Sequence, residues 1–262
     1  MAESIPEIAV FDDIWEGGYF EGDPLSPVAV SSYGRLGFVS VLFATYLSCI
    51  RPYLASDSAV LEIGPGRGAW TKCMLGAREV WAVDVRSAER NGFWRYVGKP
   101  PNVRYLQVSN YGCSELPDNY FDFLFSYGCF CHIPPDRASE YLRNIFPKLK
   151  SGARCFVMVS DYRKFNRAIE NFRELSIDSY FVRHPGGEMV RRVARVLRRF
   201  ADRCEPVPAR YDLNEDSAAR PMRWFHLGAE EMSRALRDIG YLVVEQDVGV
   251  NVRDPILHFT KP

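Results

Sequence analysis

The sequence predicts an α/β fold in which seven buried strands alternate with helices. Three observations support it. An apolar run at 60–63 ends in a turn with glycines at alternate positions, which leads a buried strand sharply into a helix. A second apolar run, 79–84, ends in a carboxylate. Runs at 102–110 and 116–126 supply two more strands in the same order along the chain. Such alternation favours a sheet covered by helices on both faces.

Turn and cap signals place the remaining elements. In chain order they are a helix over 31–53, a helix over 136–149 entered at Pro134 and Pro135 and left at Ser151 and Gly152, a strand over 154–160, a helix from 225–231 to Gly240, and strands at 241–247 and 256–260 that form an antiparallel pair.

The chain is expected to fold around one core with two additions. We assign 1–56 to an N-terminal flap and helix, 57–160 to the core, 161–223 to an inserted lid, and 224–262 to the C-terminal part of the core. The insertion of about sixty residues is too long for a bare loop in a compact domain, so we expect helices within it.

Composition excludes several classes of partner. Lys plus Arg and Asp plus Glu both number 33, which argues against a general nucleic-acid or anionic-membrane surface. The seven cysteines include no CxxC pair, and Cys129-x-Cys131 alone cannot assemble a zinc site. The start of the chain does not resemble a signal peptide, so the sequence predicts reduced thiols in a cytoplasmic protein.

The glycine turn has two interpretations. A dinucleotide fingerprint requires G-x-G-x-x-G, but Ala69 stands where its third glycine would fall. The observed pattern is Glu62-x-Gly64-x-Gly66-x-Gly68. Asp84 follows Gly64 by about twenty residues, and a carboxylate there accepts hydrogen bonds from ribose hydroxyls of either NAD or S-adenosylmethionine (SAM).

The glycine pattern resembles motif I of class I SAM-dependent methyltransferases, and the L-P-…-F-D-…-S segment at 116–126 resembles their fourth strand. The resemblance implies a Rossmann-like seven-stranded sheet with SAM as cofactor. It also implies that the end of the third strand lies beside the adenine, where the family usually has Asp and this chain has Ser109 and Asn110. The cofactor-binding residues expected on this basis are Glu62, Gly64, Gly66, Gly68, Asp84, Ser109, Asn110, Ser126 and Tyr127.

Methyl transfer to a hydroxyl needs alignment and a proton acceptor. His132 lies just past the fourth strand and is the candidate base, although it could instead support its loop. Asp161 ends the fifth strand and could bind a substrate hydroxyl, orient His132, or hold Mg²⁺ if the enzyme uses a metal. The alternative for Asp161 is a helix cap.

Three residues are candidates for contact with the acceptor. Tyr19 and Tyr33 lie in the N-terminal flap, and sugars pack well on aromatic faces with polar tips. His226 precedes a helix and could reach the crevice, although a packing role is the alternative.

The strings at 22–25 and 125–135 resemble bacterial sugar O-methyltransferases. That resemblance implies methylation of a hydroxyl on a sugar or oligosaccharide, such as a mannose oligosaccharide in polysaccharide biosynthesis, and it allows a homodimer. Three alternatives stay open: a methyltransferase of a small phenolic or amine metabolite, an NAD-dependent oxidoreductase, and a catalytically silent subunit that binds SAM.

Overall fold

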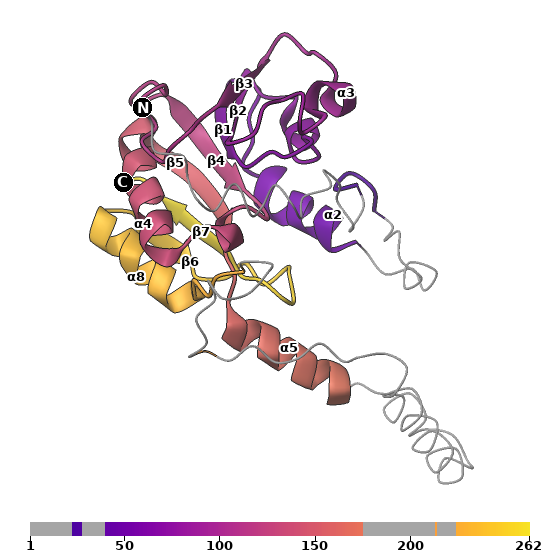
Figure 1. Cartoon of the computed structure of the whole chain (residues 1–262), viewed down its shortest axis with the longest axis vertical. Helices are drawn as coiled ribbons and strands as arrows, with labels where there is room; N and C mark the ends of the chain where they lie inside the picture. The colour runs from indigo at the N-terminus through magenta and orange to yellow at the C-terminus, as the bar shows by residue number, and fades with distance from the viewer. Residues whose placement is uncertain (1–22, 28–39, 175–212, 214–223) are drawn as a thin grey trace, which may run out of the picture. The chain divides into compact units, whose positions relative to one another are not determined.

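A single mixed sheet of seven strands forms the centre of the fold (Figure 1). The computed structural model describes residues 23–27, 40–174, 213 and 224–262. The strand order is β3-β2-β1-β4-β5-β7-β6. In chain order the strands are β1 Ala59–Ile63, β2 Glu79–Asp84, β3 Val103–Gln107, β4 Phe121–Ser126, β5 Leu149–Met158, β6 Leu242–Glu245 and β7 Ile256–Thr260.

The first five strands are parallel, and β7 runs antiparallel to both β5 and β6. The predicted seven-stranded sheet and its antiparallel last pair are therefore confirmed. The order of the strands reverses between β1 and β4. In open α/β sheets the carboxyl ends of the strands at such a switch point form the crevice where ligands bind.

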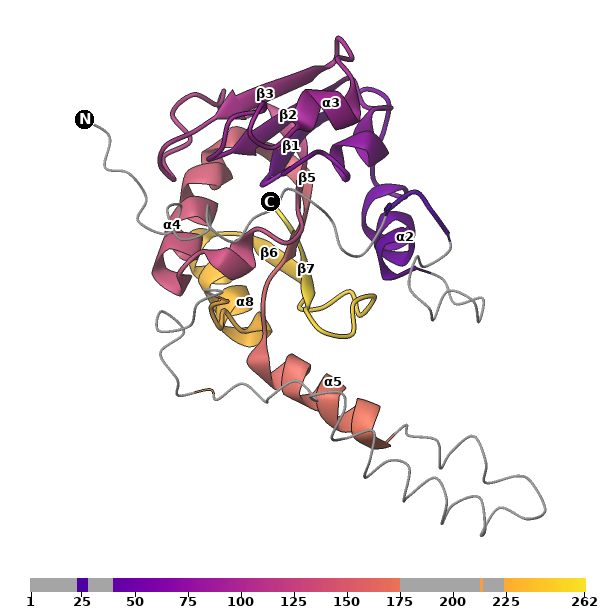
Figure 2. The same cartoon turned by 45° about the vertical axis from the view of Figure 1, so that its right-hand side comes forward.

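Helices cover both faces of the sheet (Figures 1 and 2). In chain order the described helices are α2 Val41–Thr45, the π-helix η2 Tyr46–Ile50, the 3-10 helix η3 Thr71–Met74, α3 Phe93–Val97, the 3-10 helix η4 Phe130–His132, α4 Pro135–Ile145, the 3-10 helix η5 Phe146–Lys148, α5 Tyr162–Glu174 and α8 Ala229–Ile239.

Side chains alternate across β1, so each face of the sheet receives its own core. On one face, Leu61 belongs to a buried cluster with Leu142 of α4 and Leu236 of α8. On the other, Val60 belongs to a cluster with Ile50 of η2 and Phe93 of α3. Full burial of such side chains contributes roughly 1.5–3 kcal/mol each.

Several element boundaries differ from the prediction. The predicted helix over 136–149 ends as an α-helix at Ile145, because Pro147 has no N–H to continue it. Ser151 and Gly152 are not a helix exit, since β5 begins at Leu149 and its pairing with β4 shifts in register before Arg154. The glycine turn leads only into the short 3-10 helix η3.

The first predicted helix is only partly within the described residues. The segment 28–39 lies outside them, and the described helical stretch ends with η2 at Ile50 instead of Tyr53.

The chain divides into two compact units. One joins Met1–Asp161 to Asp216–Pro262 and contains the whole sheet. The other, Tyr162–Glu215, contains α5. The role of segment 161–223 as a lid stays a prediction.

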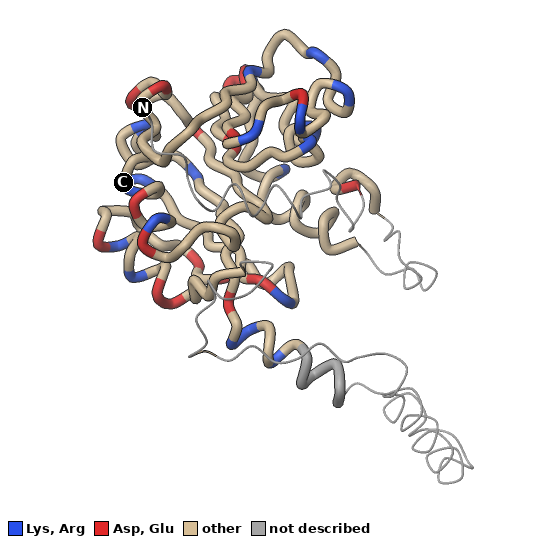
Figure 3. The backbone as a smooth tube through the Cα atoms, in the orientation of Figure 1, with Lys and Arg blue, Asp and Glu red and all other residues tan. Residues whose placement is uncertain are grey.

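Basic and acidic residues are interspersed along α4 and α8 (Figure 3). Among the described helices, none is both long enough and apolar enough to cross a membrane.

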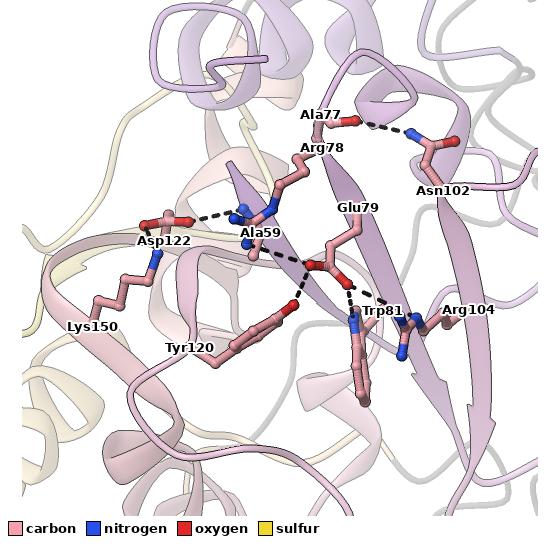
Figure 4. Close-up of polar contacts among 10 residues, drawn as sticks. All are labelled: Ala59, Ala77, Arg78, Glu79, Trp81, Asn102, Arg104, Tyr120, Asp122 and Lys150. Carbon is pink, nitrogen blue, oxygen red and sulfur yellow. Dashed lines mark hydrogen bonds and ion pairs between the residues drawn. The ribbon is translucent and has the colours of Figure 1, made fainter. Parts of the chain in front are cut away.

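A polar network joins the amino ends of the strands, at the edge opposite the glycine turn (Figure 4). Glu79 accepts hydrogen bonds from the Tyr120 hydroxyl and from Trp81 Nε1, the latter at 2.8 Å. Arg78 and Arg104 pair with the same carboxylate at 3.4 and 3.8 Å. Burial opposes the charge of Glu79, but these hydrogen bonds and arginines outweigh it and lower the pKa of the carboxyl.

Glu79→Gln should destabilise the protein near neutral pH by about 1–2 kcal/mol, because hydrogen bonds to a charged group are lost. A carboxyl whose pKa is lowered in the folded state stabilises above its unfolded pKa and loses this contribution as pH falls through the folded value. The difference in unfolding free energy between the two proteins should therefore shrink below about pH 4. Urea denaturation at pH 7 and pH 3.5 measures it, and a difference independent of pH would contradict the assignment.

Candidate cofactor and active site

The backbone leaves β1 through a turn that only glycine fits easily. Gly64, Gly66 and Gly68 have φ angles of +70°, +52° and +93°, a region that other residues rarely adopt. The Gly64 N–H donates to the Val83 carbonyl at 2.9 Å, and the Gly66 N–H donates to Asp84 Oδ2 at 3.2 Å. These bonds attach the turn to the end of β2. We call residues 64–68 the glycine loop.

Neighbouring protein atoms also require two of these glycines. A Cβ on Gly64 would lie 2.5 Å from Cys129 Cβ, and one on Gly68 would lie 2.2 Å from Val97 Cγ2. Glycines in such a turn let a ligand approach the backbone closely. The structure adds a second reason, which is the packing of the loop against the segment after β4 and against α3.

The helix that follows the loop is shorter than the sequence suggested. It is the single 3-10 turn of η3, so the dipole and free N–H groups of a long helix are not present at this position. Ligand binding here depends on the loop backbone and on the side chains around it.

Glu62 is buried within β1, with 2% of its surface exposed. Its Oε2 accepts a hydrogen bond of 2.6 Å from Thr71 Oγ1, which links β1 to η3. Burial raises the pKa of Glu62 to about 8, and the negative charge of Asp84 adds to the effect, while the bond from Thr71 opposes it. In this arrangement Glu62 joins β1 to the first residue of η3, just after the glycine loop.

Asp84 ends β2 beside the glycine loop. Its Oδ1 accepts the Arg86 N–H at 2.9 Å, and its Oδ2 accepts the Gly66 N–H. Burial raises the pKa of Asp84, although these backbone donors act against it. The Asn91 side chain also hydrogen-bonds to this carboxylate. A carboxylate has about four lone-pair sites, so Asp84 retains capacity to accept from a ribose hydroxyl.

The end of β4 is tied to the end of β1. Ser126 Oγ donates to the Ile63 carbonyl at 2.9 Å. The next residue, Tyr127, is 6% exposed and packs its ring 4.8 Å from that of Trp70. Ser109 and Asn110 lie exposed beyond β3, where Asn110 Oδ1 accepts the Gly112 N–H at 2.7 Å.

The structure brings the segments that carry His132, Asp161 and His226 together. The Phe225 N–H donates to the Cys131 carbonyl at 3.0 Å, which places the residues before α8 against η4. The Leu227 and Gly228 N–H groups donate to the Ser160 carbonyl at 3.1 and 3.0 Å. His132 follows Cys131, Asp161 follows Ser160, and His226 lies between Phe225 and Leu227. His132 and His226 are partly buried.

Asp161 is buried, and its Oδ2 accepts the Ala229 N–H at 3.0 Å. This hydrogen bond supports the helix-cap alternative, because Ala229 is the first residue of α8. A second role in the crevice stays a prediction. Within the described residues there is no group of three or more His, Cys, Asp or Glu that could hold a metal ion.

Tyr19 and Tyr33 lie outside the described residues. The loop between β6 and β7, from 246 to 255, contains none of the site residues predicted from the sequence. Asn251 in this loop is 7% exposed and donates from Nδ2 to the Tyr127 hydroxyl at 3.3 Å. The only signal in the sequence is an Asn before Arg253 and Asp254, which is typical of a turn.

The family model described as "Methyltransferase domain" matches residues 38–246 of the chain. One similar solved structure is described as the complex of the Haloferax volcanii Trm112 methyltransferase activator and the putative methyltransferase, with 14% identity, a TM-score of 0.50, and coverage of 78% of this chain and 69% of that one. Another is a SAM-dependent methyltransferase from Aquifex aeolicus, with 17% identity, a TM-score of 0.49, and coverage of 83% and 93%. No curated protein matches the chain.

Glu62→Gln should stabilise the ligand-free protein, and the gain should depend on pH. Because the folded pKa of about 8 lies above that of the unfolded chain, wild-type stability falls as pH rises from about 4.3 to about 8. The Gln variant lacks this loss and can still accept from Thr71. The difference in unfolding free energy should grow through this window to on the order of 1–3 kcal/mol. Urea denaturation at pH 5 and pH 8.5 tests it, and an equal difference at both would refute the raised pKa.

Proposed function

The chain belongs to the methyltransferase domain family, as a class I SAM-dependent enzyme, and we propose that its acceptor is a hydroxyl group of a sugar or oligosaccharide. Membership follows from the family match over residues 38–246. The acceptor is argued from the residues around the carboxyl ends of β4 and β5 and from the sugar O-methyltransferase resemblance at 125–135.

The glycine loop and Asp84 fit SAM. The backbone at Gly64 and Gly66 is fixed by hydrogen bonds to the end of β2, and Asp84 retains acceptor capacity beside it. We assign the methionine and ribose part of SAM to the glycine loop and its ribose hydroxyls to Asp84. When bound, SAM supplies a methyl group on a sulfonium, which is a strong leaving group.

The convergence of three backbone segments is the observation that carries the O-methyltransferase proposal. The bonds from Phe225 to Cys131, and from Leu227 to Ser160, join η4, the end of β5 and the entry to α8 at one edge of the sheet. In the proposed role, neutral His132 takes the proton of the sugar hydroxyl. At the same time the hydroxyl oxygen bonds to the methyl carbon and the carbon–sulfur bond of SAM breaks. Asp161 and His226 then orient the acceptor.

The purified protein should transfer labelled methyl groups from SAM to sugar hydroxyls. We would incubate it with mannose oligosaccharides, sugar phosphates, phenols and amines, each with and without Mg²⁺, and locate the label by mass spectrometry. His132→Gln should lower kcat by about 10²–10⁴-fold, the usual contribution of general-base catalysis, while leaving the affinity for S-adenosylhomocysteine within about twofold.

The other outcomes separate the alternatives. Label on phenols or amines alone would contradict the sugar acceptor but keep the enzyme class. Tight NADH binding without SAM binding would favour the oxidoreductase. An unchanged rate in His132→Gln would remove His132 from the chemistry, and SAM binding with no label on any acceptor would favour a silent subunit.

A further inference from the structure

We propose that Asn251 is a positioning residue for the cofactor site, which holds the glycine loop in its binding shape through Tyr127 and Trp70. This inference rests on the proposed SAM site, because it concerns the residues that keep that site formed. It adds the loop 246–255, between β6 and β7, to the residues that form the site.

The loop 246–255 lies at the same edge of the sheet as the glycine loop. Since β7 is antiparallel to β5, its first residue, Ile256, pairs with Met158 at the carboxyl end of β5. The Val159 N–H donates to the Pro255 carbonyl at 3.0 Å, which fixes the end of the loop there. In the order of the strands, β4 lies beside β5, and β1 lies next after β4.

The orientation of the Asn251 amide is determined by its own loop. Its Oδ1 accepts the N–H groups of Arg253 and Asp254 at 3.0 and 3.4 Å. The Nδ2 group must therefore point the other way, where it lies 3.3 Å from the Tyr127 hydroxyl and 3.7 Å from Met158 Sδ. A buried amide in this position is costly unless it is hydrogen-bonded, so the loop and Tyr127 fix each other.

Tyr127 connects the Asn251 loop to the glycine loop by packing against Trp70. Its ring centroid lies 4.8 Å from that of Trp70, whose own ring lies 5.1 Å from Phe125 of β4. Trp70 is 1% exposed and follows Gly68 by two residues. The buried indole therefore fixes the point at which the glycine loop ends, and Tyr127 forms one wall of the indole's packing site.

A change at Asn251 should reach the glycine loop before it reaches the rest of the fold. Asn251→Ala removes the donor to Tyr127 and loosens the Tyr127–Trp70 contact. A matched control is Asn102→Ala, at the amino edge of the sheet. There Nδ2 donates to the Leu75 carbonyl at 3.0 Å and to the Ala77 carbonyl at 2.9 Å (Figure 4). Both variants lose the hydrogen bonds of an amide side chain, but only the first should affect the cofactor site.

Hydrogen–deuterium exchange of the ligand-free protein gives the first test. Peptides covering Gly64–Trp70 should exchange about fivefold or more faster in Asn251→Ala than in wild type, and at the wild-type rate in Asn102→Ala. The Kd of S-adenosylhomocysteine, measured by calorimetry, should rise about fivefold in Asn251→Ala, as expected for one hydrogen bond, and stay within about twofold of wild type in the control.

Tyr127→Phe removes the same hydrogen bond from its other side. It should reproduce the exchange effect, and the double variant should add little to either single change. Equal exchange at 64–70 in Asn251→Ala and Asn102→Ala would overturn the positioning role, even if both proteins are less stable. If wild type fails to bind S-adenosylhomocysteine, the proposed cofactor fails, while the exchange comparison still decides whether Asn251 holds the loop.

Discussion

The reversal of the backbone at Gly64 is the constraint on which the site depends. At this residue the chain adopts a left-handed conformation, donates its N–H to Val83 at the end of β2, and approaches Cys129 so closely that a Cβ has no room. Cys129 directly precedes η4, the 3-10 helix that ends at His132. One close contact therefore sets both the shape of the proposed cofactor loop and the position of the proposed base. The hydrogen bond from the Ser126 hydroxyl to the Ile63 carbonyl joins the carboxyl ends of β4 and β1.

The pKa values of carboxyl groups are shifted in opposite directions at the two edges of the sheet. At the amino edge, hydrogen bonds and arginines lower the pKa of Glu79, so its charge stabilises the fold. At the carboxyl edge, burial raises the pKa values of Glu62 and Asp84, so ionising either carboxyl costs stability. Carboxyls in such surroundings are concentrated at functional sites. Glu62 already bonds to Thr71 within the protein, whereas Asp84 lies at the open end of β2 beside the loop.

Much of the fold could be predicted because local signals and topology agree. Apolar runs ending in Glu62-x-Gly64 and in Asp84 located β1 and β2, and both strands lie where expected. The start of β5 could not be read, because Ser151 and Gly152 resemble a helix exit but lie in a strand whose pairing shifts in register. The contact of Asn251 with Tyr127 was equally hidden, since the two residues are far apart in sequence and only the antiparallel β7 brings that loop to the crevice. The roles of His132 and Asp161 remain proposals, although their backbone segments do meet.

The most direct test of the account is the affinity of the Asp84→Asn variant for S-adenosylhomocysteine, measured by calorimetry beside wild type. Asn carries no charge and has a donor group in place of one acceptor oxygen, whereas hydrogen bonds to a charged group contribute about 1.5–3 kcal/mol each, so Kd should rise by about tenfold or more. Asp122→Asn, at the amino edge, where the carboxylate binds Ala59 N–H and Lys150, should leave Kd unchanged. Wild-type affinity in a folded Asp84→Asn variant would rule out the assignment of SAM to this edge of the sheet.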